Sequence, residues 1–190
     1  MLPPGLGFNA ISASALAASK TARMPRVYWD WAPMIRDNAA GFFPTTPAIN
    51  LLYGLREAVH MMEDEGLANV FARHTRFAEA TRRAVRAWGL ELFCARPEEY
   101  SSALTAIVMP DGHDADVFRK IVLERFDMSL GAGLGKLKGK VFRVGHLGDF
   151  NDLMLAGTLS GVEMGLAVAG VPFLRGGVTA ALEYLAGGVD

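Results

Sequence analysis

Residues 129–148 read SLGAGLGKLKGKVFRVGHLG. The closely spaced glycines of GAGLG suggest at first sight a loop that cradles a phosphate. A dinucleotide-binding loop needs a helix directly after its glycines, whereas here three lysines lead into the apolar segment VFRV. The pattern therefore predicts a glycine-rich loop between two strands, Met128–Leu130 and Val141–Val144. Such a loop is either a mobile connection or a cover over a ligand, and the residues alone leave both interpretations open.

Short strands and helices alternate around this block. Strands are expected at Leu90–Cys94 and Ala103–Met109, and a helix is expected at Asp114–Phe126, just before the block. After it, Asn151–Ala169 and Val178–Ala186 have the composition of helices. This alternation predicts an α/β fold, here an α+β small domain in which helices cover a mixed sheet.

The residues before Gly89 are expected to be mostly helical. Thr46 is a good N-cap, Pro47 suits a first helical position, and apolar residues then recur at helical spacing until Gly66. The further predictions for this part are a strand at Phe8–Ser12, a helix at Ser14–Arg23, a loop at Ala32–Pro44 and a helix at Leu67–Trp88.

Composition restricts the class of protein. The 190 residues are 51% hydrophobic and carry a formal net charge of −1, which excludes disorder for the bulk of the chain. A near-neutral chain with a pI of about 6.4 is also a poor match for nucleic acid, so a small polar metabolite or a protein partner is expected. The single cysteine, Cys94, cannot form an internal disulfide and is expected in the core. A reducing, cytoplasmic location follows as an expectation, and the first residues carry no pattern of a secretory leader.

Residues 153–174 form the one segment that suggests a membrane helix. Its length is that of a bilayer span, and its small residues include the spaced glycines Gly157, Gly161 and Gly165. However, Glu163 lies near its centre and Pro172 would break the helix before its end. We therefore expect a buried helix of a core and no membrane interaction.

Arg143 is the most informative candidate for binding. A guanidinium within an apolar strand is seldom buried without an anionic partner, so Arg143 binds a ligand carboxylate, points to solvent, or pairs with Asp149. Thr46 is either a plain helix cap or a cap that also offers its hydroxyl to a phosphate. No metal site is expected, because the four histidines lack the spacing of metal ligands, and no GxSxG motif of a serine hydrolase is present. These histidines are His60, His74, His113 and His146.

Several segments together resemble one enzyme family. They are MLPPGLGFNA, TTPAINLLYGLREAV, EGLANVFARHTRFAEATRRAVRAWGLEL, LSGVEMGL and the block 129–148. These segments are similar to the serine–glyoxylate and alanine–glyoxylate aminotransferases of the class V, fold type I pyridoxal-phosphate family, and the similarity runs nearly from end to end. The resemblance implies the C-terminal portion of such an enzyme: 1–45 as a remnant of the large cofactor domain, 46–66 as a linking helix, and 67–190 as the small domain.

The resemblance also implies roles for particular residues. Arg143 matches the arginine that grips the α-carboxylate of the substrate. Thr46 matches a threonine that reaches the cofactor phosphate of the neighbouring subunit, with Thr45 and Phe43 beside it at the cofactor site. An aromatic residue or tyrosine commonly precedes that threonine in the family, and here Phe43, Pro44 and Thr45 stand in its place.

The lysine that forms the Schiff base lies, in that family, a few residues before the position of Met1. The chain is therefore expected to lack it, since no lysine occupies the matching context. The lysines are Lys20, Lys120, Lys136, Lys138 and Lys140.

Two hypotheses of function follow. In the first, the chain belongs to a homodimeric, pyridoxal 5'-phosphate-dependent aminotransferase that moves an amino group from serine or alanine to glyoxylate, giving glycine and a 2-oxo acid. The chain alone is then expected to be inactive, with an incomplete cofactor site. In the second, it is a non-catalytic module from a truncated or split gene that acts only by pairing with another subunit.

Overall fold

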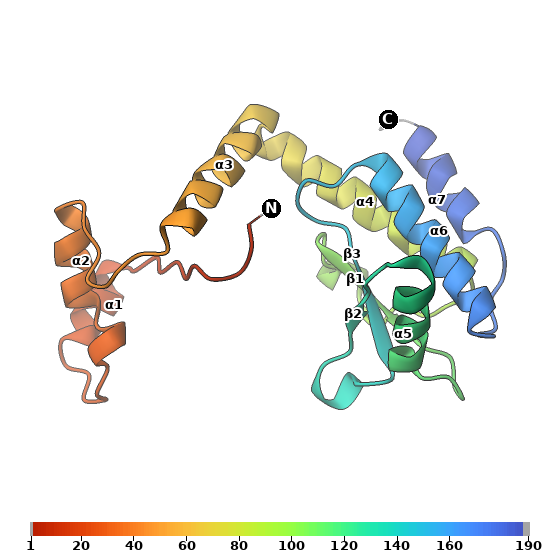
Figure 1. Cartoon of the computed structure of the whole chain (residues 1–190), viewed down its shortest axis with the longest axis horizontal. Helices are drawn as coiled ribbons and strands as arrows, with labels where there is room; N and C mark the ends of the chain where they lie inside the picture. Colours follow the sequence, from red (N-terminus) through yellow and green to blue (C-terminus); the bar gives the residue numbers. More distant parts are fainter. Residues whose placement is uncertain (1, 188–190) are drawn as a thin grey trace. The chain divides into compact units, whose positions relative to one another are not determined.

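A computed structural model describes residues 2–187 of the chain. The chain divides into two compact units, Met1–Asp64 and Glu65–Asp190. Each unit is described by itself below, and Figure 1 labels the elements of both.

The first unit consists of helices and irregular segments. α1 spans Ala13–Ser19, α2 spans Trp31–Ala39, and α3, Ile49–Glu65, ends just past the unit boundary. A short 3₁₀ turn, η1, spans Val27–Trp29. None of these helices contains a buried residue.

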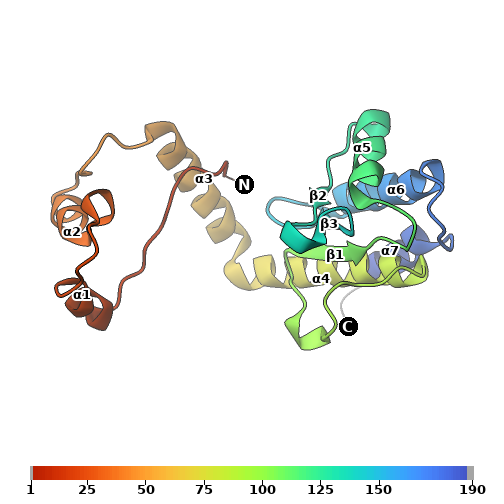
Figure 2. The ribbon, with the colours of Figure 1, turned by 90° about the horizontal axis from the view of Figure 1, so that it is seen from below.

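The second unit is a small sheet with helices packed against it. Its helices are α4 (Leu67–Ala87), α5 (Ala115–Phe126), α6 (Asp152–Val168) and α7 (Gly177–Ala186), and its strands are β1 (Leu104–Val108), β2 (Gly131–Ala132) and β3 (Val141–Gly145). Two 3₁₀ turns, η2 and η3, span Pro97–Glu99 and Gly135–Leu137. The strand order is β1-β3-β2, so the strand of the block 129–148 that carries Arg143 lies at the centre of the sheet. Figure 2 shows α4 running alongside β1, while α5 contacts β2 and β3, and α6 packs against α5, α4 and α7.

The core lies between the sheet and these helices. Alternate residues of the strands point into it, so Thr105, Ile107, Phe142 and Val144 are buried on one face of the sheet. The helices contribute most of the remaining large buried side chains, among them Phe77, Trp88, Phe118, Leu155, Leu159 and Leu166. The other face of the sheet carries Ala106, Arg143 and Gly131, which lie opposite one another in register.

Capping side chains fix the ends of two of these helices. Asp114 accepts hydrogen bonds from the N–H groups of Asp116 and Val117, at 2.7 and 3.1 Å, and starts α5. Asn151 accepts one from the N–H of Met154 at 2.9 Å and starts α6. Both starts agree with the predicted ones.

α6 confirms the expectation of a buried core helix. Leu155, Leu159, Val162 and Leu166 are fully buried in it. Gly165 lets α5 approach closely, since a Cβ there would lie 2.5 Å from the side chain of Val122. Among residues 2–187, no helix combines the length and the apolar character that crossing a membrane requires.

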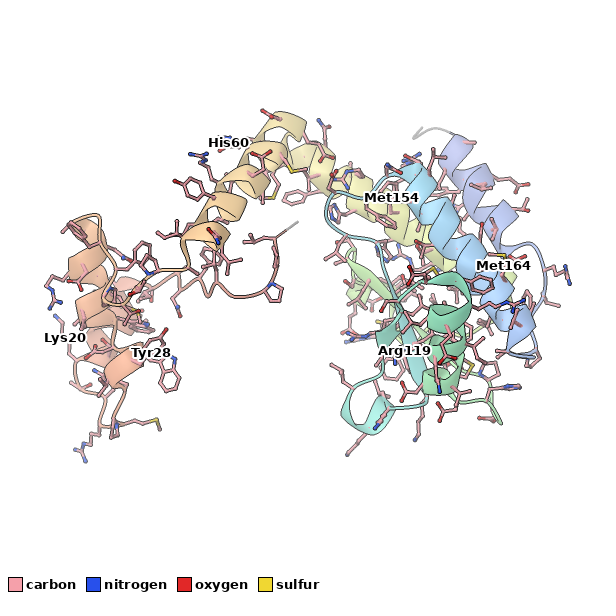
Figure 3. The ribbon with its side chains drawn as sticks, in the orientation of Figure 1. Lys20, Tyr28, His60, Arg119, Met154 and Met164 are labelled. Carbon is pink, nitrogen blue, oxygen red and sulfur yellow. The ribbon has the colours of Figure 1, made fainter. Side chains whose placement is uncertain are left out.

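The fold class is confirmed, and the sheet differs from the expectation in its pairing. Every pair among the described strands is antiparallel, where a mixed sheet was expected. The predicted strand Met128–Leu130 is also wrong, because the paired residues are Gly131 and Ala132. The Nε–H of Arg119 on α5 (Figure 3) donates to the carbonyl of Leu130 at 2.7 Å, and this contact takes the place of a ladder hydrogen bond.

The predicted strand Leu90–Cys94 is reduced to a single bridge. Leu92 pairs with Ile107, and only two backbone hydrogen bonds flank this bridge. Cys94 is half-buried, not part of the core, and its thiol lies 3.6 Å from the carbonyl oxygen of Arg96. The expectation of Cys94 as a core residue is therefore wrong.

Two predictions in the first unit are also wrong, and a third is right except for the end of its helix. Phe8–Ser12 is irregular, because no second strand in this unit offers it ladder partners. α2 occupies much of the expected loop Ala32–Pro44. Asp30 caps this helix by accepting from the N–H of Ala32, and Pro33 lies in the first turn, where no intrahelical N–H is needed. The predicted helix Ser14–Arg23 is α1, which ends earlier than expected.

The helix expected to begin at Thr46 begins instead at Ile49. Its first α-helical hydrogen bond runs from the N–H of Leu52 to the carbonyl of Ala48, at 3.1 Å. Thr46 thus lies three residues before the first residue of α3, and among residues 2–187 no N–H of the helix donates to its hydroxyl, so Thr46 does not cap the helix.

Candidate functional site

Arg143 lies in the middle of the central strand β3. Its neighbours across the strands are Ala106 on β1 and Gly131 on β2, which share its face of the sheet. The guanidinium stem is thus flanked by the two smallest side-chain types. Ala106, Arg143 and Gly131 thus place the guanidinium on the face of the sheet opposite the buried core.

The Nε atom of Arg143 is buried and has no hydrogen-bond partner among residues 2–187. Arg143 also forms none of the ion pairs found in this part of the chain, so the expected alternative of a pair with Asp149 is not observed. Leaving a buried N–H of a charged group unpaired costs more than about 1 to 3 kcal/mol. A ligand anion that accepts from this N–H would remove that cost.

His146 follows β3 and is fully buried. Its ring Nε2 lies 2.9 Å from Oγ1 of Thr105, and its backbone N–H donates to the carbonyl of Ala103 at 3.0 Å. Burial lowers the pKa of the imidazole from 6.5 to about 4, so the ring is neutral at physiological pH. Arg143 is therefore not accompanied by a second positive charge from this histidine.

Two residues of α4 hold the turn that follows His146. Nη1 of Arg73 donates to the carbonyls of Gly148 and Phe150, at 2.7 and 3.1 Å. The N–H of Gly148 donates to Nε2 of His74 at 3.0 Å, while Nδ1 of that ring lies 2.7 Å from the carbonyl of Val70. One ring nitrogen of His74 thus accepts from an N–H while the other faces a carbonyl, so the ring bridges α4 and the turn after His146.

Glu65 completes this cluster. It accepts from Nε and Nη2 of Arg73 at 2.6 and 2.7 Å, and these hydrogen bonds hold the pKa of the Glu65 carboxyl below its ordinary value. Sequence analysis missed Arg73 and Glu65. The only signal was that His74 interrupts an otherwise apolar helix face.

The expected cofactor residues lie in a different unit from Arg143. Phe43, Thr45 and Thr46 are exposed in the irregular segment between α2 and α3.

The described residues do not by themselves fit pyridoxal phosphate. A Schiff-base lysine needs a desolvated or cationic environment that favours its free amine, and all five lysines are exposed. Lys20, at the end of α1, is labelled in Figure 3, and the others are Lys120, Lys136, Lys138 and Lys140. Thr46 has the right side chain for a phosphate contact, but nothing around it forms a cradle.

A further pocket lies at the start of β1, and the residues that line it include Arg82, Cys94, Tyr100 and Thr105. Within residues 2–187, no group of three or more histidine, cysteine, aspartate or glutamate side chains is placed to hold a metal ion.

Comparisons with known proteins give a consistent result. No protein-family model matches the chain. The serine–glyoxylate aminotransferase of Methylorubrum extorquens is 47% identical, with 97% of this chain and 48% of that protein covered. The L-aspartate–glyoxylate aminotransferase of Paracoccus denitrificans is 46% identical, with 97% and 47% covered. The chain thus spans about half the length of the curated relatives it matches.

Solved structures agree with these sequences. The pyridoxamine–pyruvate aminotransferase of Mesorhizobium loti superposes with a TM-score of 0.80 at 29% identity, over 93% of this chain and 46% of that one. The ureidoglycine–glyoxylate aminotransferase of Bacillus subtilis superposes with a TM-score of 0.77 at 26% identity, over 92% and 45%. By sequence and by fold, the chain belongs to the class V, fold type I family of pyridoxal-phosphate aminotransferases.

Proposed function

We propose that this chain is part of an aminotransferase that moves an amino group from serine or alanine to glyoxylate, giving glycine. The relatives named above support glyoxylate as the acceptor, because three of the four carry it in their names. We assign residues 1–45 to the remnant of a large cofactor domain, 46–66 to a linking helix and 67–190 to the small domain. The enzyme works with pyridoxal 5'-phosphate at a site that this chain completes only in part.

The observation that carries this proposal is the unpartnered Nε of Arg143. A guanidinium presents parallel donors that match the two oxygens of a carboxylate. Amino acid and 2-oxo acid substrates both carry an α-carboxylate beside the reacting carbon. Arg143 therefore holds the substrate by the group that both halves of the reaction share.

The test uses a fusion in which the part of the Methylorubrum extorquens relative that this chain does not match precedes Met1. With serine, glyoxylate and added cofactor, the fusion should form glycine. Arg143→Ala should lower kcat/KM by roughly tenfold to over a hundredfold, the effect of losing about 1.5 to 3 kcal/mol or more. Arg143→Lys should recover only part of this, because an ammonium offers no parallel fork.

Cofactor absorbance should persist in both variants, since Arg143 contacts the substrate and not the cofactor. If Arg143→Ala keeps normal kcat/KM and only melts at a lower temperature, Arg143 has a structural role and the assignment is wrong.

We further propose that the 190-residue chain alone has no transaminase activity. All five of its lysines are exposed, which gives none of them the environment of a Schiff-base lysine. The purified chain with cofactor, serine and glyoxylate should show no glycine formation and no lysine-dependent change in cofactor absorbance. Measurable turnover by the chain alone would contradict this proposal.

Thr46, with Thr45 and Phe43, is proposed to contact the cofactor phosphate of a neighbouring subunit in a homodimer. The exposure of this segment supports the proposal, because its side chains are accessible to another chain. In the fusion, Thr46→Val should raise the cofactor concentration needed for half-maximal activity while leaving KM for serine unchanged. An equal affinity for cofactor in both proteins would remove Thr46 from the site.

A second candidate function is a non-catalytic module that acts by pairing with another subunit. It is favoured by the first unit, in which α1, α2 and α3 bury no residue while Val27, Trp29 and Phe42 are largely exposed. The fusion and sedimentation together separate the two functions: a fusion that forms no glycine, with a purified chain that self-associates, supports this candidate, whereas glycine formation by the fusion or a monomeric chain counts against it.

A further inference from the structure

Gly131 lies beside Arg143 in a way that leaves no spare room. An ideal Cβ built on Gly131 would lie 3.0 Å from Cβ of Arg143 and 3.2 Å from its Nε. Both distances are shorter than ordinary van der Waals contacts between such atoms. The stem of Arg143 thus occupies the space that any other residue at position 131 would fill.

The backbone conformation at position 131 does not require a glycine. Gly131 belongs to β2, is paired with Arg143 across the sheet, and does not have a positive φ angle. The usual reason for a glycine, a left-handed backbone, therefore does not apply here. The remaining reason is the close approach of the arginine side chain.

The opposite flank of Arg143 is also small. Ala106 pairs with Arg143 from β1 on the same face. On the glycine side, a Cβ would meet the Nε atom that lacks a partner. The arginine leans across β2, and this places its unpaired N–H in a buried position.

We propose that Gly131 is a positioning residue for Arg143, setting where the guanidinium meets the substrate carboxylate. The inference rests on the proposed function for the carboxylate and goes beyond it by naming the residue that orients the arginine. A methyl group at position 131 pushes the stem by a few tenths of an ångström. Misplacement of this size should weaken carboxylate binding by about threefold to tenfold, and a bulkier valine should weaken it further.

The experiment measures the arginine directly in the purified 190-residue chain. The Nε–H signal of Arg143 is recorded by ¹⁵N NMR and assigned by its loss in Arg143→Lys. In Gly131→Ala this signal should shift and exchange faster with water, because the group leaves its buried position. In the double variant Gly131→Ala with Ala106→Gly it should return toward the wild-type position, since the arginine regains room on the other side.

Gly157→Ala is the matched control. It adds the same methyl group at a glycine with open space around it, so the Arg143 signal should stay unchanged. Melting of each variant is followed in parallel to confirm that the fold is kept. An unchanged Arg143 signal in Gly131→Ala, or a shift of equal size in Gly157→Ala, overturns the inference.

Sodium glyoxylate is then added as the probe of the proposed function. A titrating shift of the Nε–H signal in the wild-type chain supports the carboxylate role of Arg143, and a weaker response in Gly131→Ala supports the inference as well. No response in the wild-type chain counts against the carboxylate role alone. The positioning role is decided separately by the spectra without ligand.

Discussion

At the scale of single residues, His146 makes the stability of the second unit depend on pH. The ring is fully buried against Thr105, and burial lowers the pKa of its imidazole from 6.5 to about 4. Between these two values the unfolded chain binds a proton that the folded chain does not bind. The free energy of unfolding therefore rises with pH from about 4 to 6.5. Above about pH 6.5 the contribution of His146 has its full value.

We expect the contribution of His146 to be of the order of 3 kcal/mol at neutral pH, lost progressively as the pH falls from 6.5 to 4. Urea unfolding between pH 4.5 and 7.5 measures it. His146→Gln should remove this part of the slope, because the amide carries no titrating proton. His60→Gln changes an exposed histidine on α3 and should leave the slope as it is. Parallel pH profiles for wild type and His146→Gln would show that folding does not lower the pKa of His146.

The residues that sequence analysis found and missed differ in their partners. Arg143 was found because a guanidinium inside an apolar strand is unusual in itself. Arg73 was missed because two of its acceptors are the backbone carbonyls of Gly148 and Phe150, far along the chain. A backbone acceptor leaves no trace in the side-chain pattern, so only the fold reveals it.

At the scale of elements, Glu163 joins three helices. Its Oε2 accepts from Nε1 of Trp88 at 2.7 Å and from the N–H of Val178 at 3.1 Å. Gly176 has no side chain to cap α7, so the carboxylate of α6 caps that helix instead. Burial opposes the charge, but these hydrogen bonds outweigh burial and hold the pKa of Glu163 below its ordinary value.

Glu163→Ala should lower the free energy of unfolding by about 1 to 3 kcal/mol, since it leaves the Trp88 N–H and the start of α7 without an acceptor. Glu163→Gln should cost less, because an amide oxygen can still accept. Glu183→Ala, at an exposed position of α7, is the control and should change little. Thermal melting compares the three, and an equal small effect of Glu163→Ala and Glu183→Ala would refute this capping role.

Gly177 adds an independent test of the same junction. A Cβ at this position would lie 2.2 Å from Nε1 of Trp88, a side chain that is fully buried and has nowhere to move. Gly177→Ala should therefore destabilise the fold by about 1 to 3 kcal/mol, whereas Gly157→Ala, in open space on α6, should be neutral or stabilising. Equal falls in melting temperature in both variants would count against overpacking at Gly177, because Gly157→Ala meets no neighbouring atom.

The elements that were predicted well are those whose own residues fix them. α5 and α6 have side-chain caps next to apolar patterns, and both began where expected. The predicted strand Phe8–Ser12 and the loop Ala32–Pro44 failed for opposite reasons. A strand depends on a partner that local sequence does not contain, while Pro33 is compatible with the first turn of a helix.

At the scale of the whole molecule, burial is distributed unequally between the two units. Every residue of the main core lies between Phe77 and Leu185. The helices of Met1–Asp64 contain no buried residue. The apolar side chains of Val27 and Met24 in this unit are 94% and 80% exposed. Apolar patterning along α3 was a correct signal for a helix, but it did not show whether the apolar side chains would find a partner within this chain.

This distribution predicts that residues 65–190 fold without the rest. All of their core contacts, the Glu65–Arg73 ion pair and the cap of α7 are contained within that segment. Expressed alone, the segment should melt cooperatively within about 5 °C of the full chain, the shift that roughly 1 kcal/mol produces in a domain of this size. Hydrogen exchange of the full chain should show the slowest amides only after Glu65. A segment that is insoluble, or that melts more than about 10 °C lower, would show that residues before Glu65 stabilise the core, and the two units would then have to be treated as one folding unit.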